Sequence, residues 1–591
     1  MKNINLVIEI CGSAGEGTIS AGEILSRFMS GQGFEIMSFD SYPAEIRGFG
    51  KCVAHTRISS GSIYSPGKFA DVLISLNDKH SISQLSALKE NGILIYDSQP
   101  ARPHKEDESV VGWTKPDMIS YGVPLNMLAH KATGNARGMN MVALGALAAL
   151  FHVDKQGFTN SIKQRYGKKK QIVIDSNVNS FLEGFDWTKK NIKKTDPYSF
   201  KGITPPKLKE KLIINGNQLV AQAALDANLT FYAGYPITPA TKIMEILSRE
   251  LPKHGGILLQ TEDEIAAIGA VIGAGFGGKR AMTATSGPGF ALMTEFTGLS
   301  VMAEVPAVII CSQRGGPSTG IPTKTEQSDF NSAVLGGTGD CPRIVLAPTD
   351  TESCYEATVL ALYLAEKYQT LVVVLLDFFL SNSIRNIDIP QKPLPKYLDA
   401  NIAPDKEDLK NYQRYKITKN GISPRTIPGT KDGMFFSTGL EHDEAGRPNY
   451  SDANHLKMTQ KRYEKFKTVL FEAPAPEISA TDIDISGKNK FDIGVISWGS
   501  SAGAAHEAVM SAQKEGINAF SFSSMMVSPF PEKELIGFSD KCKKILIPEL
   551  NFSGQFANFA TQILKRPVER LNFITGRPMA SEDILEKMRE M

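Results

Sequence analysis

The sequence predicts an α/β protein made of three α/β regions. Short apolar runs with the composition of strands alternate with helical patterns over residues 1–190, 211–385 and 486–591. Two stretches lack this alternation: residues 191–210 are rich in lysine and proline, and residues 386–485 are polar and irregular. We expect the first stretch to be a linker, and the second to be a long connection that wraps around a partner or another domain.

Size and composition limit the classes of protein that this chain can belong to. Its 591 residues predict several domains, and 42% hydrophobic with 22% charged residues is typical of a soluble globular protein. A net charge of +2 gives no electrostatic reason to expect nucleic acid or a membrane as partner. The apolar run at residues 371–376 is too short to span a bilayer, and the N-terminal segment lacks the layout of a signal peptide. We therefore expect a cytoplasmic protein.

The cysteines predict no metal centre within this chain. None of the six stands in a C-x-x-C pair, so the spacing indicates neither a zinc site nor an iron–sulfur cluster. In a cytoplasmic protein they are expected to stay reduced, most of them as small hydrophobic residues.

The first region opens with a strand, a glycine-rich loop, a helix and a second strand. The strands are expected over residues 4–10 and 34–42, with the helix at 21–33 between them. Further strands are expected at residues 52–59, 70–76 and 92–97, and further helices at 82–91 and 138–151.

The glycine-rich loop Gly12–Gly17 allows two interpretations. Glycines let a backbone approach an anion, and the following helix N-terminus carries free N–H groups, so a phosphate-bearing ligand is one. A tight strand-to-helix turn is the other. The spacing matches neither the dinucleotide fingerprint G-x-G-x-x-G nor the GK[ST] of a P-loop.

The second region contains two strand-to-helix junctions with candidate site residues. In "AGYPITPATKIME" two prolines fix the backbone around Thr238, and Thr241 is placed to cap the helix that follows. In "LLQTEDEIAAIGAVIGAGFGGKR" the spacing of Thr261 and Glu264 matches a capping box, which is a structural reason for that glutamate. The helix behind it consists largely of alanine and glycine, which predicts close approach to another backbone or a ligand.

A polar loop, "CSQRGGPSTGIPTKTEQSDF", follows a strand of the second region directly. Its Arg314 carries a planar set of donors suited to a carboxylate or a phosphate, and nearby hydroxyl groups such as that of Thr323 can orient the same ligand. The residues alone equally allow a surface arginine paired with Asp329 or Glu326.

Taken together, these segments resemble the 2-oxoacid:ferredoxin oxidoreductase family over essentially the whole chain. The resemblance rests on "GYPITPAT", "QTEDEIAAIGAVIGA", "TSGPG", "QRGGPSTGIPTKTEQSDF", "TGLEHDEAGRP" and "NFSGQ", in the family's order. It is to the type with a γ-like domain fused ahead of the α-like domains. It implies a γ-like domain at 1–190, a thiamine-diphosphate-binding domain of the pyrimidine type at 211–385, and a transketolase C-terminal-like domain at 486–591.

The resemblance also implies an activity, its cofactors and its partners. The family decarboxylates a 2-oxoacid oxidatively on thiamine diphosphate, coenzyme A takes the acyl group, and ferredoxin takes the electrons. "GDCPRIVLAP" is most similar to members that use 2-oxoglutarate, with succinyl-CoA as product; pyruvate and branched or aryl 2-oxoacids remain open. This chain lacks the GDG…N motif and the cluster cysteines. The resemblance therefore places Mg²⁺, the diphosphate pocket and a [4Fe-4S] cluster in a β subunit, within a dimer of αβ heterodimers.

The resemblance assigns a role to each matching residue. Glu264 matches the glutamate at N1′ of the aminopyrimidine, and Tyr235, Pro236 and Ile237 lie in the cofactor-contacting YPITP motif. Thr238, in the same motif, matches the threonine beside cofactor and substrate. Arg314 matches the arginine that binds the substrate carboxylate, and Thr323 matches a position linked to the choice of 2-oxoacid.

The resemblance also identifies the glycine-rich loop of the first region with a loop that contacts coenzyme A. The matching residues are Gly12, Ser13, Gly15, Gly17 and Thr18, with Arg57 as a basic residue near the same ligand. One departure is Glu23, at a position where some relatives have lysine, which weakens the expected phosphate contacts.

Two other classes of function compete with this interpretation. A nicotinamide or flavin dehydrogenase would need G-x-G-x-x-G after the first strand and an acidic residue at the end of the second. Asp40 satisfies the second requirement, but the glycine spacing does not satisfy the first. A non-catalytic scaffold for electron transfer would leave Thr238, Glu264 and Arg314 without a shared purpose.

Overall fold

The computed structural model confirms the α/β class. It describes the chain in five stretches, residues 4–43, 50–99, 109–203, 211–478 and 490–591. The chain forms two compact units: Met1–Ile214 with Ser383–Ile389, and Asn215–Asn382 with Pro390–Met591. Within the described stretches, no helix has the length and apolar character needed to cross a membrane.

The first unit is built on a mixed sheet. Its described strands lie in the order β6-β5-β4-β1-β3-β2-β14-β7. Their bounds are β1 (Asn5–Ser13), β2 (Glu35–Ser41), β3 (Lys51–Ser59), β4 (Ala70–Ser75), β5 (Leu88–Asp97), β6 (Ile119–Val123), β7 (Leu212–Asn215) and β14 (Ile384–Ile387). β1, β4, β5 and β6 run parallel, whereas β3 pairs antiparallel with both β1 and β2.

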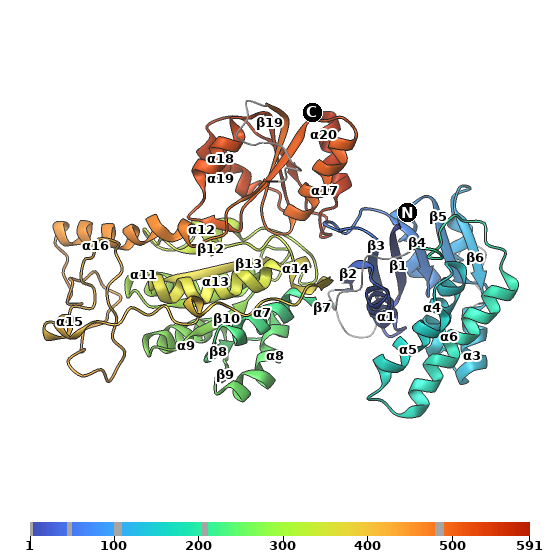
Figure 1. Cartoon of the computed structure of the whole chain (residues 1–591), viewed down its shortest axis with the longest axis horizontal. Helices are drawn as coiled ribbons and strands as arrows, with labels where there is room; N and C mark the ends of the chain where they lie inside the picture. Colours follow the sequence, from blue (N-terminus) through green and yellow to red (C-terminus); the bar gives the residue numbers. More distant parts are fainter. Residues whose placement is uncertain (1–3, 44–49, 100–108, 204–210, 479–489) are drawn as a thin grey trace. The chain divides into compact units, whose positions relative to one another are not determined.

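Helices cover this sheet because its strands are apolar on both faces. They are α1 (Thr18–Gly31), α2 (Asp78–Ile82), α3 (Leu125–Thr133), α4 (Met139–Leu150), α5 (Lys155–Tyr166) and α6 (Gln171–Asn191). Ile8 and Ile10 of β1 join a core with α1, α4, α5 and α6, whereas Val7 and Cys11 point to the opposite face. Figure 1 shows α1, α4, α5 and α6 gathered together against the sheet. A Cβ on Gly145 of α4 would lie 2.1 Å from the carbonyl oxygen of Phe181 in α6, so the backbones of the two helices touch.

The first unit differs from the sequence expectations at three places. The helix expected at 82–91 is wrong, because α2 ends at Ile82 and β5 already begins at Leu88. The described part of the expected linker runs against the first unit, where Tyr198 and Phe200 pack on its core. β14, at the end of the region expected as the second domain, instead pairs with β2 in the first unit's sheet.

The second unit contains two sheets. The larger one has the order β18-β12-β13-β11-β10-β8-β9, and the smaller one β15-β17-β16-β19-β20, among the described residues. The larger comprises β8 (Phe231–Gly234), β9 (Ile257–Gln260), β10 (Ala281–Thr285), β11 (Ala307–Gln313), β12 (Ile344–Leu346), β13 (Leu371–Asp377) and β18 (Met526–Ser528). The smaller comprises β15 (Glu477–Ile478), β16 (Phe491–Ser497), β17 (Ala519–Ser523), β19 (Cys542–Glu549) and β20 (Glu569–Asn572).

The two sheets of the second unit share one core. β18 comes from the third region of the sequence but pairs antiparallel with β12, so the third region lends a strand to the larger sheet. Ile309 and Val373 of that sheet belong to the same buried cluster as Trp498 and Phe556.

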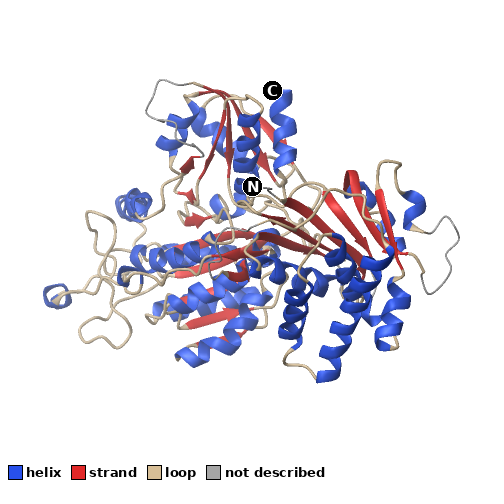
Figure 2. Ribbon diagram, turned by 45° about the vertical axis from the view of Figure 1, so that its right-hand side comes forward, coloured by secondary structure: helices blue, strands red, loops and turns tan. Residues whose placement is uncertain are grey.

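Helices pack on both sheets of the second unit (Figure 2). On the larger sheet and in the connecting segment these are α7 (Gly216–Asp226), α8 (Thr241–Glu250), α9 (Glu264–Phe276), α10 (Gly287–Leu292), α11 (Thr294–Met302), α12 (Phe330–Val334), α13 (Ser353–Tyr368), α14 (Phe378–Asn382), α15 (Lys406–Lys410) and α16 (Asp452–Glu464). On the smaller sheet they are α17 (Ser501–Lys514), α18 (Glu532–Ser539), α19 (Gln555–Leu564) and α20 (Ser581–Glu590).

The irregular segment after β14 wraps around the second unit, as the sequence predicts for so long a connection. Nη2 of Arg414 donates to the carbonyl oxygen of Glu304 at 2.6 Å, and Nζ of Lys461 in α16 donates to the Glu304 carboxylate at 2.7 Å. All three residues are buried, so the segment is bound to the second unit by charged contacts shielded from water.

Candidate active site

Three neighbouring parallel strands bring the predicted residues of the second region to one edge of a sheet. β8, β10 and β11 lie side by side, so the loops at their carboxyl ends leave the sheet together. Thr238 follows β8, and Arg314 comes directly after β11. Glu264 joins them as the first residue of α9, which follows β9, the other neighbour of β8.

The YPITP segment after β8 meets the arginine loop directly. The carbonyl oxygen of Thr238 accepts a hydrogen bond from Nη1 of Arg314 at 2.7 Å. Tyr235 at the start of the segment is 41% exposed. The expectation that Thr241 caps the following helix is wrong: α8 begins at Thr241 itself, the residue before it is Ala240, and the cap position has no side-chain hydrogen bond.

Glu264 does not serve as a helix cap. Asp263 is the N-cap of α9 and accepts a hydrogen bond from the backbone N–H of Ala266 at 2.7 Å, while the Thr261 hydroxyl donates to the Asp263 carbonyl oxygen at 2.8 Å. The expected capping box is therefore wrong. Glu264 is 6% exposed, and its carboxylate accepts no hydrogen bond from another described residue.

The first turn of α10, which follows β10, leaves space for this carboxylate. A Cβ added to Gly289 would lie 2.5 Å from Oε1 of Glu264, so any larger residue would displace it. Glu264 is thus a buried carboxylate that neither caps a helix nor accepts a hydrogen bond from another described residue.

Arg314 is buried and does not lie on the surface. It is 7% exposed, and Nη2 donates to the carbonyl oxygen of Thr319 at 3.1 Å, in addition to the bond to Thr238. Burial lowers the pKa of its guanidinium, while the charges of Asp329 and Glu264 oppose that shift. Among the described residues no ion pair joins Arg314 to Asp329 or Glu326, and its guanidinium is buried against two backbone carbonyls, so the alternative of a paired surface arginine is wrong.

The loop that carries Arg314 closes on itself and is anchored to the third region. The N–H of Gly315 donates to the carbonyl oxygen of Lys324 at 3.1 Å, which brings the two ends of the loop together. Thr325 donates its N–H to the carbonyl oxygen of Gly576 at 3.2 Å. Thr323 is 3% exposed at the base of this closed loop, whereas Ser318 and Thr319 form its exposed tip. Thr319 contacts Arg314 through its backbone carbonyl oxygen.

Buried polar atoms without hydrogen-bond partners gather around this edge. Within the described residues they include Oγ of Ser286, Nε of Arg314 and Oδ2 of Asp329. Buried polar atoms are nearly always satisfied, so such a group marks a place where a ligand or water supplies the missing partners. The sequence analysis identifies neither Ser286 nor a site role for Asp329. The available signal was the pair of glycines in "TSGPG", since Gly287 adjoins the carboxylate of Asp329 and Gly289 adjoins that of Glu264.

The glycine-rich loop of the first unit holds a carboxylate of its own. Oε2 of Glu16 accepts the N–H of Ser13 at 2.6 Å, and Oε1 accepts Nδ2 of Asn77 at 3.3 Å. Gly15 and Gly17 adopt φ of 95° and 78°, which favour glycine, and Thr18 is buried with its hydroxyl unpartnered. The loop N–H that a phosphate would use at Ser13 is therefore already bound to Glu16.

Arg57 does not lie at that loop. On β3 it pairs with Val7, whereas the loop residue Gly12 pairs with Cys52. Five residues of strand separate the two positions, about 16 Å at 3.3 Å per residue. The guanidinium is buried, with Nε donating to Oδ1 of Asn5 at 3.0 Å and Nη1 to the carbonyl oxygen of Ser65 at 2.7 Å.

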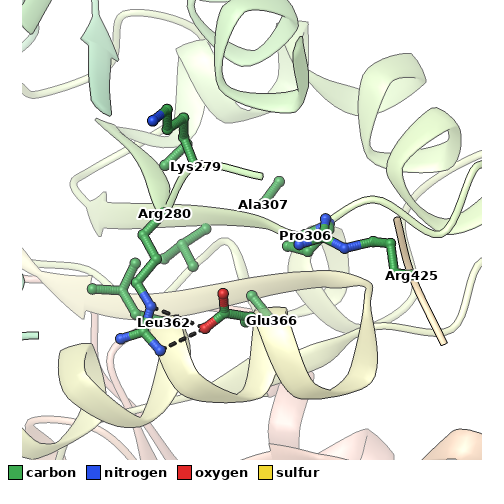
Figure 3. Close-up of a pocket in the computed structure, with 10 residues that line it drawn as sticks. Lys279, Arg280, Pro306, Ala307, Leu362, Glu366 and Arg425 are labelled. Carbon is green, nitrogen blue, oxygen red and sulfur yellow. Dashed lines mark hydrogen bonds and ion pairs between the residues drawn. The ribbon is translucent and has the colours of Figure 1, made fainter. Parts of the chain in front are cut away.

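Arg280, another buried arginine of the second unit, has a structural role (Figure 3). Nε of Arg280 donates to Oε2 of Glu366 at 3.0 Å and Nη1 donates to the carbonyl oxygen of Tyr397 at 2.8 Å. The cavity beside them, also lined by Arg425, measures about 10 Å³, which is room for about one water molecule. These contacts join the connecting segment to the sheet and leave no space for a substrate.

Comparison with family models covers all three regions of the chain. Residues 7–187 match the model described as pyruvate ferredoxin/flavodoxin oxidoreductase. Residues 222–461 match its thiamine-diphosphate-binding domain, and residues 492–584 match core domain II of pyruvate:ferredoxin oxidoreductase. The three α/β regions are therefore the γ-like, the thiamine-diphosphate-binding and the transketolase C-terminal-like domains of this group.

Individual relatives agree with these models. The chain is 36% identical to the 2-oxoglutarate synthase subunit KorA of Methanothermobacter marburgensis, over 65% of this chain and 99% of that one. It is 30% identical to the 2-oxoglutarate oxidoreductase subunit KorA of Mycobacterium tuberculosis, over 98% of this chain and 90% of the other.

A solved structure is similar over the full length. The 2-oxoglutarate:ferredoxin oxidoreductase of Magnetococcus marinus, described with 2-oxoglutarate, coenzyme A and succinyl-CoA bound, superposes with a TM-score of 0.92 at 36% identity and covers 100% of both chains. The chain belongs to the 2-oxoacid:ferredoxin oxidoreductase family, as an α subunit that carries a γ-like domain at its N-terminus.

Proposed function

We propose that this α subunit acts on 2-oxoglutarate, which the assembled enzyme converts to succinyl-CoA and CO₂ while a pair of electrons passes to ferredoxin. The observation that carries the proposal is the convergence of a buried, unpartnered carboxylate at Glu264 and a buried arginine with an open donor at Arg314. The similarity to the KorA subunits and to the Magnetococcus structure supports 2-oxoglutarate as substrate. Pyruvate and branched or aryl 2-oxoacids are the alternatives, and the reverse, reductive carboxylation follows the same chemistry.

The residues present fit thiamine diphosphate on the side of its aminopyrimidine ring. A ring nitrogen that must exchange a proton requires a buried carboxylate with no other partner, and Glu264 beside Gly289 meets that requirement. Tyr235, Pro236 and Ile237 would flank the ring. When bound, the cofactor supplies the nucleophilic carbon that attacks the 2-oxo group. Glu264 holds and returns the proton at the aminopyrimidine nitrogen.

Arg314 and Thr238 would position the substrate. The Arg314 guanidinium lies in a site with little access to water, so it binds a 2-oxoacid carboxylate more strongly than an exposed arginine does. Its bonds to the carbonyls of Thr238 and Thr319 hold the guanidinium plane in place. Thr323, at the base of the same loop, would border the substrate's tail.

The first unit would contact coenzyme A through the loop at Gly12, Ser13, Gly15, Gly17 and Thr18. Because the Glu16 carboxylate takes the Ser13 N–H, we place an uncharged part of coenzyme A, not a phosphate, against this loop. Arg57 would act only indirectly, by holding β3 to Asn5 and Ser65.

The β subunit completes this proposal. It would hold Mg²⁺, the diphosphate and a [4Fe-4S] cluster that passes electrons to ferredoxin, in a dimer of αβ heterodimers. The resemblance to the family supports this division, and the sequence is consistent with it because it lacks the GDG…N motif and paired cluster cysteines.

The first prediction concerns this division of labour. The isolated chain is expected to oxidise no 2-oxoacid, whereas the chain produced together with its β subunit is expected to reduce ferredoxin with 2-oxoglutarate and coenzyme A. A panel of 2-oxoglutarate, pyruvate and branched 2-oxoacids measures the preference as kcat/KM. Robust activity of the isolated, metal-free chain would contradict the proposal, and a preference for pyruvate would overturn the substrate.

The second prediction concerns Arg314. Arg314→Ala is expected to raise KM for the 2-oxoacid strongly while thiamine diphosphate still binds, because a buried carboxylate contact is worth about 2–4 kcal/mol, roughly 30- to 700-fold. Steady-state kinetics of the assembled enzyme measure this. Arg249→Ala, at an exposed arginine of α8, is the control and should leave KM unchanged. An unchanged KM in Arg314→Ala would remove the assigned role.

A further inference from the structure

Asp329 ends the arginine loop, directly before α12, but its side chain does not cap that helix. Its backbone is fixed by other bonds: the N–H donates to Oε1 of Gln313 at 3.0 Å, and the carbonyl oxygen accepts the N–H of Ala333 at 2.9 Å. No side-chain hydrogen bond caps α12. The carboxylate is therefore not needed to form the local structure.

The carboxylate lies instead against the first turn of α10, which follows β10. A Cβ added to Gly287 would lie 2.7 Å from Oδ2 and 2.8 Å from Oδ1 of Asp329. Glu264 meets the same helical turn at Gly289, two residues along, so the glycines of one turn accommodate two carboxylates. Oδ2 of Asp329 is buried without a hydrogen-bond partner, as is Nε of Arg314.

Charged and titratable groups face Asp329 from each element packed around it. Burial raises the pKa of Asp329 to about 6; Glu326 of the same loop raises it as well, and Arg314 lowers it. Burial raises the pKa of the Cys311 thiol of β11, and the negative charge of Asp329 raises it further, so the thiol stays neutral. Glu264 lies beside Gly289, two residues from the glycine that adjoins Asp329, and its charge also acts on Arg314. Arg314 is thus the cation that offsets both carboxylates.

We infer that Asp329 is a positioning residue for Arg314 that takes up a proton when the carboxylate of a 2-oxoacid binds. This inference rests on the proposed function, because it takes Arg314 as the group that binds the substrate. Before the substrate arrives, ionised Asp329 is the counter-charge that stabilises the buried guanidinium. The incoming carboxylate replaces that counter-charge and repels Asp329, which then binds a proton from solvent. Charge in the site is conserved, because one carboxylate gains a proton as another enters.

Isothermal titration of 2-oxoglutarate into the cofactor-free αβ complex near pH 7 tests this without turnover. Repeating the titration in buffers of different ionisation enthalpy measures the protons taken up on binding. We expect the unaltered complex to take up roughly half a proton or more, and Asp329→Asn to take up none. Asp329→Asn should also bind about fivefold more tightly at pH 7.5, since a competing charge near Arg314 is gone. Its KM should no longer fall as the pH is lowered towards 6.

The control is Asp388→Asn, at an exposed aspartate, which should behave as the unaltered complex. Absence of proton uptake in the unaltered complex overturns the inference, even if Asp329→Asn fails to fold. Equal uptake by Asp329→Asn and the unaltered complex overturns it as well. Arg314→Ala separates the two proposals. If it binds 2-oxoglutarate normally, the role of Arg314 itself is wrong; if it binds weakly while Asp329→Asn keeps its proton uptake, only the role of Asp329 is wrong.

Discussion

Glu264→Gln is expected to lower kcat of the assembled enzyme by about 10²- to 10⁴-fold, the usual contribution of a positioned acid–base group. Glutamine keeps the size of the side chain and can still contact the aminopyrimidine ring, but it cannot hold the proton that a carboxylate holds. Thiamine diphosphate should therefore still bind. The loss should appear in kcat and kcat/KM together, since the carboxylate acts on the reaction and not on binding of the 2-oxoacid.

The structure provides a matched control for this substitution. Glu262 lies two residues earlier in the same junction and is exposed, whereas Glu264 is buried. Glu262→Gln should leave kcat unchanged. Because the Glu264 carboxylate accepts no hydrogen bond from the described residues and Asp263 caps the helix, Glu264→Gln should also leave the melting temperature close to that of the unaltered protein. Full activity in Glu264→Gln, or an equal loss in Glu262→Gln, would contradict the assigned role.

The α/β class and most strands of the first unit were predictable because their signals are local. Runs such as those at β1, β3 and β4 are buried along nearly their whole length and read as strands from composition alone. The helix expected at 82–91 was wrong because its last residues form the beginning of β5. Over so short a segment, hydrophobic periodicity cannot distinguish a helix from a strand. Capping at Thr261 failed for a similar reason: Asp263, two residues on, competes for the same helix end.

Pairings between distant segments were not predictable. β14 pairs with β2, and β18 pairs with β12, across hundreds of residues, and neither short strand carries a pattern that names its neighbour. The site shows the same limit. The composition of its loop makes Arg314 a candidate, whereas the sequence indicates Asp329 only as a possible surface partner of Arg314. Burial decides whether a carboxylate forms an ion pair or is left without a hydrogen-bond partner, and the sequence does not show burial.

The connecting segment is the clearest case in which polarity misleads. Its lysines and arginines suggest a solvated surface, yet Lys461, Lys465 and Arg414 are each less than 4% exposed and surround the buried carboxylate of Glu304. Nζ of Lys461 lies 2.7 Å from Oε1 and 2.8 Å from Oε2 of Glu304, and Lys465 contacts the same carboxylate. The carboxylate of Glu304 therefore offsets the charges of several buried cations of the connecting segment. We expect this carboxylate to hold the segment on the second unit.

Glu304→Gln is expected to destabilise the second unit by about 3–5 kcal/mol, the cost of leaving buried cations without their counter-charge. The apparent melting temperature and the rate of limited proteolysis within residues 390–478 measure this. Glu245→Gln is the control, because its ion pair with Lys242 is exposed and should contribute at most about 1 kcal/mol. Adding Lys465→Met to Glu304→Gln should restore part of the loss, since it removes one of the unpaired charges.

The pH dependence of this effect has a defined sign. Burial by itself raises the pKa of Glu304, but Lys461, Lys465 and Arg414 outweigh burial and hold it below its usual range. The stabilisation that Glu304 contributes is therefore complete above about pH 5 and is lost as the pH falls further, through its folded-state pKa.

Lys465 determines the alkaline side of the pH dependence. Burial lowers the pKa of Lys465 to about 7, so its proton is held more weakly in the folded than in the unfolded chain. Stability should consequently rise between about pH 7 and 10. In Glu304→Gln the lysines lose their proton even more readily, so the loss of stability relative to the unaltered protein should be largest near pH 5 and should shrink as the pH rises through the folded-state pKa values of the two lysines. A deficit independent of pH would mean that packing, not charge, holds the segment in place.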